Sequence, residues 1–543
     1  MHSPTAYLLS VFCGPAVLLM AGILPVSRPV KGHARLGRGP VVAVVISLAM
    51  ALLSTLMLAV NGKLDAQLAG TSWPIQLSVG TYFDSLSATM LLLVTFIGVI
   101  IVRFSERYLD GDANQPRFMR LVCLTLSFVS LLIISGNVMM FAIAWLLTSI
   151  SLHSLLIYYP ERPAAILAAR KKFVISRLGD LMLVIAIVIC YQLFGSFEYG
   201  VIFQQVETLA SAERSSNETI LTSLAGFFFV IGAMTKSAQF PFHSWLPDTL
   251  ETPTPVSALM HAGIINAGGF LVIRLSPLIT HSHTAMDLLA LTGGLTALLG
   301  VVCMLPQTSV KRMLAYSTMA QMGFMMLQCG LGAFSAALLH IVAHSLYKAN
   351  AFLSSGSVLE TKLGLIPQAR ITSHPISLLM LSLAFVISTS LIGFAYYMFG
   401  LFSADKPGSW ILSFILTLAL TQLLWTGFNS YNRSVTLRSL AAAVGVTVIY
   451  IGSYIGFDAI LSTSVSSVST MLSIQDVLVM SLVAVGFSGV FLLQISVAKY
   501  ANTRFMTALY VAAANGFYLD IFVHRIVNFI YRPPFTSVFK SIL

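Results

Sequence analysis

Apolar residues in this chain gather into long uninterrupted runs that short polar connections separate. A run of about 20 apolar residues has the length of a helix that crosses a bilayer. We therefore predict about fifteen membrane-spanning helices, with one further helix at 505–531 that either spans the membrane or lies along its surface. The predicted spans lie near residues 6–26, 40–60, 83–103, 119–136, 138–158, 172–194, 219–239, 254–275, 285–304, 312–330, 334–355, 375–400, 409–428, 437–456 and 476–497.

The composition supports this interpretation. Of the 543 residues, 57% are apolar and 9% are charged, whereas soluble domains carry about 25% charged residues. The first run has no basic start and no cleavage site, so we interpret it as a retained helix and not as a signal peptide. The sequence thus predicts an all-α polytopic membrane protein with about 15–16 transmembrane helices.

The net charge of +11 raises the question of a nucleic-acid partner, but the positions of the charges argue against one. Twenty of the 30 Lys and Arg residues fall in alternate connections, and three fall in the opposite set. This bias is the positive-inside pattern, which predicts basic connections in the cytoplasm and an N-terminus outside. We therefore expect the basic charge to meet anionic lipid headgroups rather than nucleic acid.

The run from Gly226 to Gly269 carries the most informative candidate chemistry. It places Lys236 inside an apolar helix, breaks at Pro241, and resumes as a second apolar helix that contains His261. A lysine within a span is costly unless it is functional or paired, and desolvation makes its proton easier to lose. Irregular backbone at membrane depth is tolerated where it lines a wet cavity. We predict that Lys236 carries protons, whereas His261 serves either conduction or helix packing.

The sixth predicted span carries Arg177 and Asp180, which share a face because they lie three residues apart. By position, Asp180 is the only acidic residue well inside a predicted span. Either the two form a structural pair, or Asp180 is the counter-ion of another buried cation. His153 in the fifth span is a further candidate, with helix packing as the alternative.

The eleventh span places His340, His344 and Lys348 four residues apart, in one stripe about 12 Å long. Two histidines at this spacing can bind zinc, but no third ligand is evident, so we predict a proton relay and no metal. Lys311, at the edge of the tenth span, is either a membrane anchor or part of a conduction path. No nucleotide or haem motif occurs and the five cysteines stand singly, so no cofactor is expected in this chain.

Three stretches resemble a known family: TKSAQFPFHSWLPDTLETPTPVSALMHAG, SVKRMLAYSTMAQMGF and LLHIVAHSLYKANAFLSSGSV. They are similar to the antiporter-like subunits of respiratory complex I and of the Mrp cation/proton antiporters. The resemblance implies two inverted five-helix repeats, each with a broken helix, and makes Lys236 the central lysine of the first half-channel. It also implies that His261, His340, His344 and Lys348 belong to a hydrophilic axis. The implied divisions are a three-helix segment (1–118), a first repeat (119–275), a second repeat (285–428), and C-terminal helices with a basic aromatic tail (429–543).

Two positions depart from the family pattern. The family's fifth helix carries a glutamate directly after a tryptophan, whereas here Trp145 is followed by Leu146. Its twelfth helix carries a lysine, whereas the corresponding span here is uncharged. The first loss removes the usual partner of Lys236 and leaves Asp180 as the candidate to replace it.

The stretches AWLLTSISLH and MHAGIINAGGFL resemble the DabB branch in particular, the membrane subunits of Dab inorganic-carbon accumulation complexes. The resemblance implies a location in the bacterial inner membrane. It also implies a soluble zinc-containing partner, DabA, on the cytoplasmic face. A flow of protons or Na⁺ through the membrane subunit would drive the hydration of CO2 in this partner. Two alternatives stay open. In the first, the chain is a subunit of a complex I or Mrp assembly. In the second, it is a non-conducting membrane anchor for its partner.

Overall fold

The computed structural model describes residues 4–24, 38–71, 77–211, 216–356, 378–400, 408–430, 432–462, 464–465 and 474–531. Long α-helices dominate this part of the chain, which confirms the predicted fold class. The long helices are α1 (Pro4–Ile23), α2 (Gly39–Asn61), α3 (Ser85–Tyr108), α4 (Gln115–Ile134), α5 (Val138–Leu156), α6 (Pro163–Phe194), α8 (Ser216–Lys236), α12 (His283–Met304), α13 (Val310–Gly330), α14 (Phe334–Leu353), α16 (Leu378–Met398), α17 (Gly408–Phe428), α18 (Arg433–Leu461) and α19 (Ile474–Tyr500). The shorter elements are α7 (Tyr199–Ser211), η1 (Thr249–Glu251), α9 (Thr254–Ala262), η2 (Ile264–Asn266), α10 (Ala267–Arg274), α11 (Ser276–Ile279), α20 (Arg504–Ala514), η3 (Gly516–Tyr518) and α21 (Leu519–Ile530).

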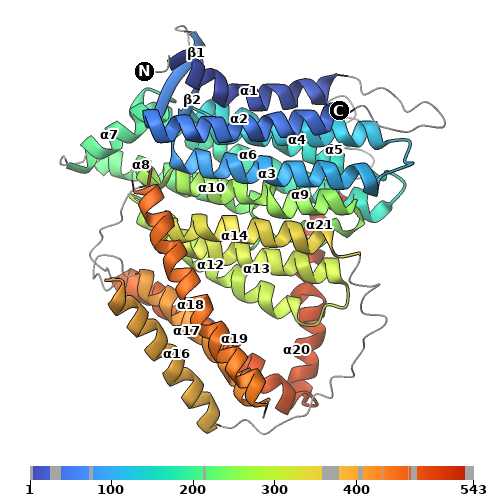
Figure 1. Cartoon of the computed structure of the whole chain (residues 1–543), viewed down its shortest axis with the longest axis vertical. Helices are drawn as coiled ribbons and strands as arrows, with labels where there is room; N and C mark the ends of the chain where they lie inside the picture. Colours follow the sequence, from blue (N-terminus) through green and yellow to red (C-terminus); the bar gives the residue numbers. More distant parts are fainter. Residues whose placement is uncertain are drawn as a thin grey trace.

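The helices from α1 to α14 lie side by side in one bundle, and successive long helices run in opposite directions (Figure 1). We call one end of the bundle the hairpin end, because a two-stranded sheet lies there. We call the other the basic end, because Arg107 at the end of α3, Arg117 at the start of α4 and Arg162 in the connection between α5 and α6 lie there. The helices α16 to α19 form a second group that crosses the bundle at an angle. They contact it through α18 against α14 and through α19 against α12.

Each of the fifteen predicted spans coincides with a helix or, at 254–275, with a pair of short helices. Thirteen of the described helical segments are both long and apolar enough to cross a membrane, and α20 with the segment 516–530 forms a bent pair with an angle of 68°. The helices α13 and α14 are long enough but are not among these thirteen. Their lower hydropathy follows from the polar side chains that they carry inside the bundle.

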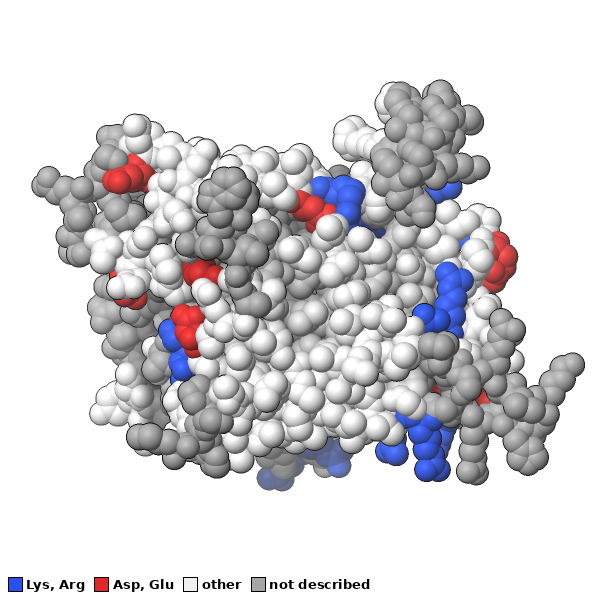
Figure 2. Space-filling model, turned by 90° about the horizontal axis from the view of Figure 1, so that it is seen from above, with Lys and Arg blue, Asp and Glu red and all other residues white. Residues whose placement is uncertain are grey.

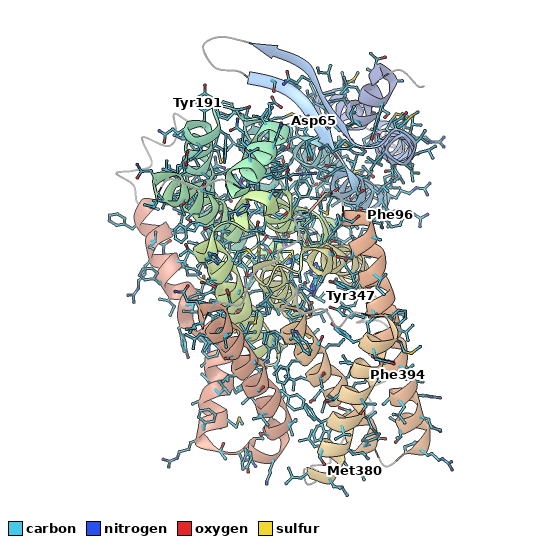
Figure 3. All side chains as sticks on the ribbon, turned by 90° about the vertical axis from the view of Figure 1, so that its left-hand side faces the viewer. Asp65, Phe96, Tyr191, Tyr347, Met380 and Phe394 are labelled. Carbon is cyan, nitrogen blue, oxygen red and sulfur yellow. The ribbon has the colours of Figure 1, made fainter. Side chains whose placement is uncertain are left out.

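The surface has the charge distribution of a membrane protein. Figure 2 shows a wide uncharged belt, with most of the visible basic side chains towards one end of the molecule and most of the acidic ones towards the other. Large aromatic side chains are exposed on the helices, including Phe96 (46% exposed), Tyr347 (62%) and Phe394 (63%) (Figure 3). Apolar surface of this extent is stable in contact with lipid tails but not with water. A multi-pass membrane protein is therefore the consistent interpretation.

The hairpin of β1 (Leu64–Thr71) and β2 (Leu77–Phe83) was not predicted from the sequence. The strands pair antiparallel between α2 and α3 (Figure 3). The hairpin leads into Asp84, whose carboxylate caps α3 by accepting a hydrogen bond from the amide of Ser87 (3.0 Å). The same carboxylate accepts two hydrogen bonds from the Arg274 guanidinium at the end of α10 (2.8 and 2.9 Å). This buried pair ties the start of α3 to the end of α10.

The proposed division into repeats at 119–275 and 285–428 stays a prediction. Part of the second repeat, residues 357–377 and 401–407, lies outside the described residues. Seven of the basic residues counted in the topology argument also lie outside the described residues: Arg28, Lys31, Arg35, Arg214, Lys362, Arg370 and Lys406.

Candidate functional site

Lys236 is the last residue of α8 and is buried inside the bundle, with 5% of its surface exposed. Its ammonium group donates a hydrogen bond to the carbonyl oxygen of Trp145 on α5 (3.3 Å). The same group lies 4.4 Å from the centre of the Trp145 ring, a cation–π geometry. The tryptophan that precedes the missing glutamate therefore contacts the lysine directly, through its backbone and its ring. Neither contact supplies a negative charge.

Asp180, the residue predicted to replace that glutamate, lies near the middle of α6. Its side chain forms an ion pair with Arg177 (2.8 Å) and is 18% exposed. The predicted structural pair is therefore present. Asp180 also interacts electrostatically with Lys236 and with Lys172, so the two interpretations of Asp180 are compatible.

The backbone around the break after Lys236 is held by hydrogen bonds to neighbouring helices. The amide of Phe240 donates to the hydroxyl of Thr296 on α12 (2.9 Å). The hydroxyl of Ser237 donates to the carbonyl of Ile265 (2.7 Å), at the point where η2 separates α9 from α10. The sequence predicted the first break from Pro241, but it did not predict the second. Two interrupted helices thus meet beside Lys236.

The interruption at η2 connects this region to α14 through polar side chains. Asn266, fully buried, donates to the hydroxyl of Ser345 on α14 (2.8 Å), and Ser345 is the neighbour of His344 in sequence. Ser237 and Asn266 therefore place polar groups between the Lys236 region and the α14 histidines. Buried polar atoms of this kind are usually satisfied by protein or by ordered water.

A second cluster of titratable groups surrounds α14. His261 on α9 is 1% exposed and its ring stacks on Phe352, with centroids 4.3 Å apart. The rings of His340 and His344 lie 6.2 Å apart. Lys348 is fully buried and donates a hydrogen bond to the carbonyl of Leu314 on α13 (3.1 Å). Among the described residues, no third metal-ligating side chain joins the two histidines.

The side chains of this second cluster have few protein partners. Both ring nitrogens of His344, Nδ1 of His261 and Nε2 of His340 are buried without a hydrogen bond to any of the described residues. Electrostatic interactions link His344 to His261, His340 and Lys348. The structure therefore gathers the four residues that the resemblance assigns to the hydrophilic axis, and it does not join them to Lys236 by a direct hydrogen bond within the described residues.

The two remaining candidates lie at the edges of the bundle. Lys311, at the start of α13, donates a hydrogen bond to the carbonyl of Thr252 (3.5 Å) in the segment that follows the break. His153, near the end of α5, packs its ring beside Phe173 with centroids 5.3 Å apart. Neither contacts Lys236 or Lys348 directly.

The sequence reasoning missed two buried lysines, because it counted them among the basic residues of the connection 162–172. Lys171 and Lys172 are inside α6, with 0% and 2% of their surfaces exposed. The signal that could have identified them is their distance from the helix start, since Pro163 begins a helix that continues without interruption through both residues.

Lys171 joins three parts of the chain at the basic end. Its ammonium group forms ion pairs with Asp248 in the segment after the break and with Asp520 on α21, both at 2.6 Å. Burial raises the pKa of the Asp248 carboxyl above its ordinary value, although the charge of Lys171 acts in the opposite direction. Lys171 is therefore a structural cation that fastens the C-terminal helix to the broken-helix segment.

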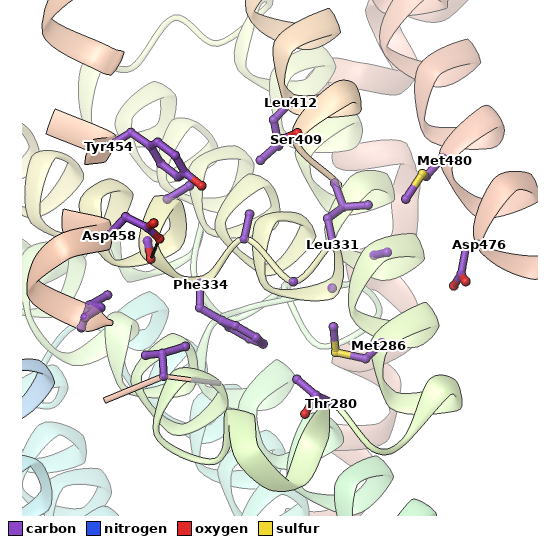
Figure 4. Close-up of a pocket in the computed structure, with 18 of the residues that line it drawn as sticks. Thr280, Met286, Leu331, Phe334, Ser409, Leu412, Tyr454, Asp458, Asp476 and Met480 are labelled. Atoms are coloured by element: carbon purple, nitrogen blue, oxygen red, sulfur yellow. Dashed lines mark hydrogen bonds between the residues drawn. The ribbon is translucent and has the colours of Figure 1, made fainter. Parts of the chain in front are cut away.

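A cavity of about 250 Å³ lies between the bundle and the second group of helices (Figure 4). Its lining includes Asp287, Asp458 and Asp476, together with the first residues of α14. The hydroxyl of Ser335 on α14 donates a hydrogen bond to Asp458 on α18 (2.8 Å) within this lining. Ser335 precedes His340 by five residues on the same helix, which is about 7.5 Å along its axis. The acidic cavity thus lies near the His340 end of the histidine stripe on α14.

Comparison with known proteins agrees with this arrangement. A family model described as NADH:quinone oxidoreductase/Mrp antiporter, TM, matches residues 135–421. A second, described as NADH-Ubiquinone oxidoreductase (complex I), chain 5 N-terminus, matches residues 71–119. The chain belongs to the antiporter-like family of NADH:quinone oxidoreductase and Mrp membrane subunits.

Relatives within this family include DabB proteins that match along most of the chain. A probable inorganic carbon transporter subunit DabB2 from Halothiobacillus neapolitanus is 36% identical, over 94% of this chain and 92% of the relative. A probable subunit DabB from Hydrogenovibrio crunogenus is also 36% identical, over 84% of each chain. By contrast, the chloroplastic NAD(P)H-quinone oxidoreductase subunit 5 of Zygnema circumcarinatum matches at 36% identity over 64% of this chain and 50% of its own length. The resemblance to the family and to its DabB branch is confirmed.

Two solved structures share the antiporter-like fold. The Mrp complex from Dietzia sp. DQ12-45-1b aligns with a TM-score of 0.55 and 22% identity, over 97% of this chain and 57% of the matched chain. The membrane-bound sulfane sulfur reductase, an archaeal respiratory membrane complex, aligns with a TM-score of 0.58 and 19% identity, over 97% of this chain and all of the matched chain. At these identities the likeness concerns the fold alone.

Proposed function

We propose that this chain is the membrane subunit of an inorganic-carbon pump, in which protons or Na⁺ cross the membrane through the chain and drive CO2 hydration in a soluble partner. One observation carries the conduction part of this proposal. Lys236, His261, His344 and Lys348 are titratable, buried within the membrane-spanning bundle, and without a carboxylate in hydrogen-bond contact among the described residues. Ionisable groups in such positions are costly and typically mark ion or proton pathways.

The names of the DabB relatives support the carbon-transport part of the proposal. In this scheme the partner is a DabA-like soluble protein that holds the zinc and performs the hydration, so the chain itself needs no cofactor and catalyses no reaction. The chain lies in the bacterial inner membrane, its N-terminus is outside, and the partner docks at the cytoplasmic basic end. The match to subunit 5 of NAD(P)H-quinone oxidoreductase makes a subunit of such an enzyme the second candidate.

The energy available from conduction is sufficient for this task. One charge that returns across the membrane releases about 2.3 kcal/mol per 100 mV. At about 1.4 kcal/mol per tenfold change in an equilibrium constant, this displaces the hydration equilibrium about fortyfold. Coupling of one proton to one hydration therefore gives a useful accumulation of bicarbonate.

The Lys236→Ala substitution tests the proposal. We expect it to abolish bicarbonate accumulation in cells, because it removes the buried ammonium group that contacts Trp145 on α5 beside the broken helix. The complex should stay assembled, because Lys236 forms no ion pair within the described residues. The measurements are uptake of labelled inorganic carbon and co-purification of the partner.

Three outcomes separate the candidates. Unchanged uptake in the Lys236→Ala variant contradicts conduction through this chain. Uptake that survives this substitution but collapses when residues at the basic end are altered indicates a non-conducting anchor. Co-purification with other subunits of a quinone oxidoreductase, in place of a carbonic-anhydrase-like protein, favours the second candidate.

A further inference from the structure

Lys172 is a buried lysine whose hydrogen bonds both go to one neutral residue. Its ammonium group donates to the carbonyl oxygen of Ser149 (2.6 Å) and to the hydroxyl oxygen of the same residue (2.7 Å). Its sequence neighbour Lys171 forms ion pairs with two carboxylates, whereas among the described residues Lys172 forms none. The structural explanation that holds for Lys171 therefore does not extend to Lys172.

The position of Lys172 on α6 places it on one face with Asp180. Lys172, Ser176 and Asp180 are separated by four residues each, so they form a stripe about 12 Å long. Since α6 starts at the basic end, Lys172 is the member of this stripe nearest to that end. Lys172 also interacts electrostatically with Lys236, which lies across the α6–α8 contact.

The charges of this region do not balance. Lys172, Arg177 and Lys236 are bases that are positively charged when protonated, and Asp180 is the carboxylate that interacts with all three. His153 adds a further titratable group within electrostatic reach of Lys172. Excess positive charge in a low-dielectric interior is costly. Because an arginine keeps its proton, a state in which one of the two lysines is neutral is favoured over a state in which both are charged.

We propose that Lys172 is the proton-exchange partner of Lys236, on the side of the path that faces the basic end. A proton leaves the Lys172 ammonium, passes by way of the Asp180 carboxylate, and binds the Lys236 amine. Once Lys236 has passed its proton on along the path towards the α14 histidines, the neutral Lys172 takes up a proton from water at the basic end. The net charge of the cluster is the same before and after the transfer, and Ser149 holds the Lys172 nitrogen in place throughout.

This role offers a physical account of the missing glutamate on α5. Leu146 stands where relatives in the family carry that carboxylate, and Ser149 on the same helix binds the additional lysine. A pair formed by a lysine and a glutamate is thereby replaced by two lysines that share one aspartate. The inference rests on the proposed conduction of protons through Lys236, and it adds a residue that the resemblance does not supply.

Two substitutions at Lys172 and one matched control test the proposal in the full complex. Lys172→Met keeps the length of the side chain but carries no proton, so proton-driven uptake of inorganic carbon should fall by about a hundredfold. Lys172→Arg keeps the positive charge but does not release its proton, so uptake by this variant should fall by a similar factor. Lys499→Met removes an exposed lysine at the end of α19 and should leave uptake unchanged. Abundance in the membrane and co-purification of the partner are measured for every variant.

The results separate the failure of this inference from the failure of the proposed function. Loss of uptake in both Lys172 variants, with normal abundance, supports proton exchange. Full activity of Lys172→Arg beside an inactive Lys172→Met shows that only the charge matters and overturns it. Wild-type uptake in both Lys172 variants, with no uptake in Lys236→Ala, also overturns it but leaves the proposed function intact. If Lys172→Met does not accumulate, Lys172→Arg decides alone.

Discussion

At the scale of single residues, the buried cations of this protein fall into two classes. Lys171 and Arg274 each bind carboxylates at 2.6 to 2.9 Å and connect separate parts of the chain. Lys236 and Lys348 instead donate to backbone carbonyl groups. A cation that is paired with a carboxylate keeps its proton and holds the structure together, whereas a cation with neutral partners exchanges its proton more readily. The second class is therefore the one that we assign to conduction.

The Asp84–Arg274 pair gives a prediction about stability. Asp84→Asn leaves the Arg274 charge buried without its counter-ion, and breaking a buried pair in this way costs about 3–5 kcal/mol. We expect a lower midpoint of thermal unfolding for the purified protein in detergent. Asp65→Asn, on the exposed part of the hairpin, is the matched control and should have a small effect.

The pH dependence of the destabilisation by Asp84→Asn tests whether the loss of the ion pair with Arg274 causes it. Burial alone would raise the pKa of Asp84, but the charge and hydrogen bonds of Arg274 lower it below its ordinary value. The ion pair therefore stabilises the protein fully above the unfolded-state pKa of about 3.9 and loses this contribution as the pH falls through the folded-state pKa. The difference between the wild type and Asp84→Asn should shrink at pH values below about 4. A difference that is constant down to pH 3 contradicts this explanation.

At the scale of elements, the interrupted helices determine where the polar groups lie. The end of α8 and the start of α10 approach each other so closely that Gly268 has no room for a side chain. A Cβ atom at Gly268 would meet the carbonyl oxygen of Ala233 and the hydroxyl oxygen of Ser237. This contact places the last turn of α8, with Lys236 at its end, against the interruption that carries Asn266.

The Gly268→Ala substitution tests the importance of this contact. The added methyl group should push α8 away from α10, destabilise the protein by about 1–3 kcal/mol and reduce inorganic-carbon uptake. Gly445→Ala on α18 is the control, because nothing lies within 4 Å of a Cβ atom there. Equal uptake by the two variants would show that the approach of α8 and α10 is not needed for function.

Much of the helical framework is predictable from the sequence, because a run of apolar residues has one stable form in a bilayer. The break at Pro241 is predictable for a similar reason, since proline lacks the amide hydrogen that a helix requires. The interruption at η2 is not, because it contains no proline and is stabilised by the hydroxyl of Ser237, which follows the end of α8. The hairpin at 64–83 was not predicted because its strands are short and lie between two long apolar runs that dominate the hydrophobic pattern.

The candidate site was predictable in part for the same reason. Lys236, His261 and Lys348 stand out because each interrupts an apolar run. Lys172 does not stand out, because it follows Arg170 and Lys171 in a basic run that is typical of a positive-inside anchor, although this run lies more than one turn inside α6. Its burial depends on how α6 packs against α5, and a single sequence does not contain that information.

At the scale of the whole molecule, the polar groups are distributed from the basic end to the acidic cavity. Lys172 and Asp180 lie on α6, Lys236 lies at the end of α8, and the α14 stripe leads towards Ser335 at the cavity. Lys171 fastens α21 to the same end of the bundle at which Lys172 meets Ser149. A partner that binds at the basic end would therefore contact the part of the molecule next to the start of the proposed path.

The most direct test of this account is the flow of cations through the purified complex in sealed proteoliposomes. An imposed membrane potential drives the flow, and dyes inside the vesicles report pH and Na⁺ separately. We predict that the wild-type complex lowers the pH inside the vesicles or raises their Na⁺ concentration. Lys236→Met should reduce the rate of this cation flow to that of empty vesicles although the partner stays bound. A Lys236→Met complex that conducts at the wild-type rate would contradict the central claim that cations pass through this chain by way of Lys236.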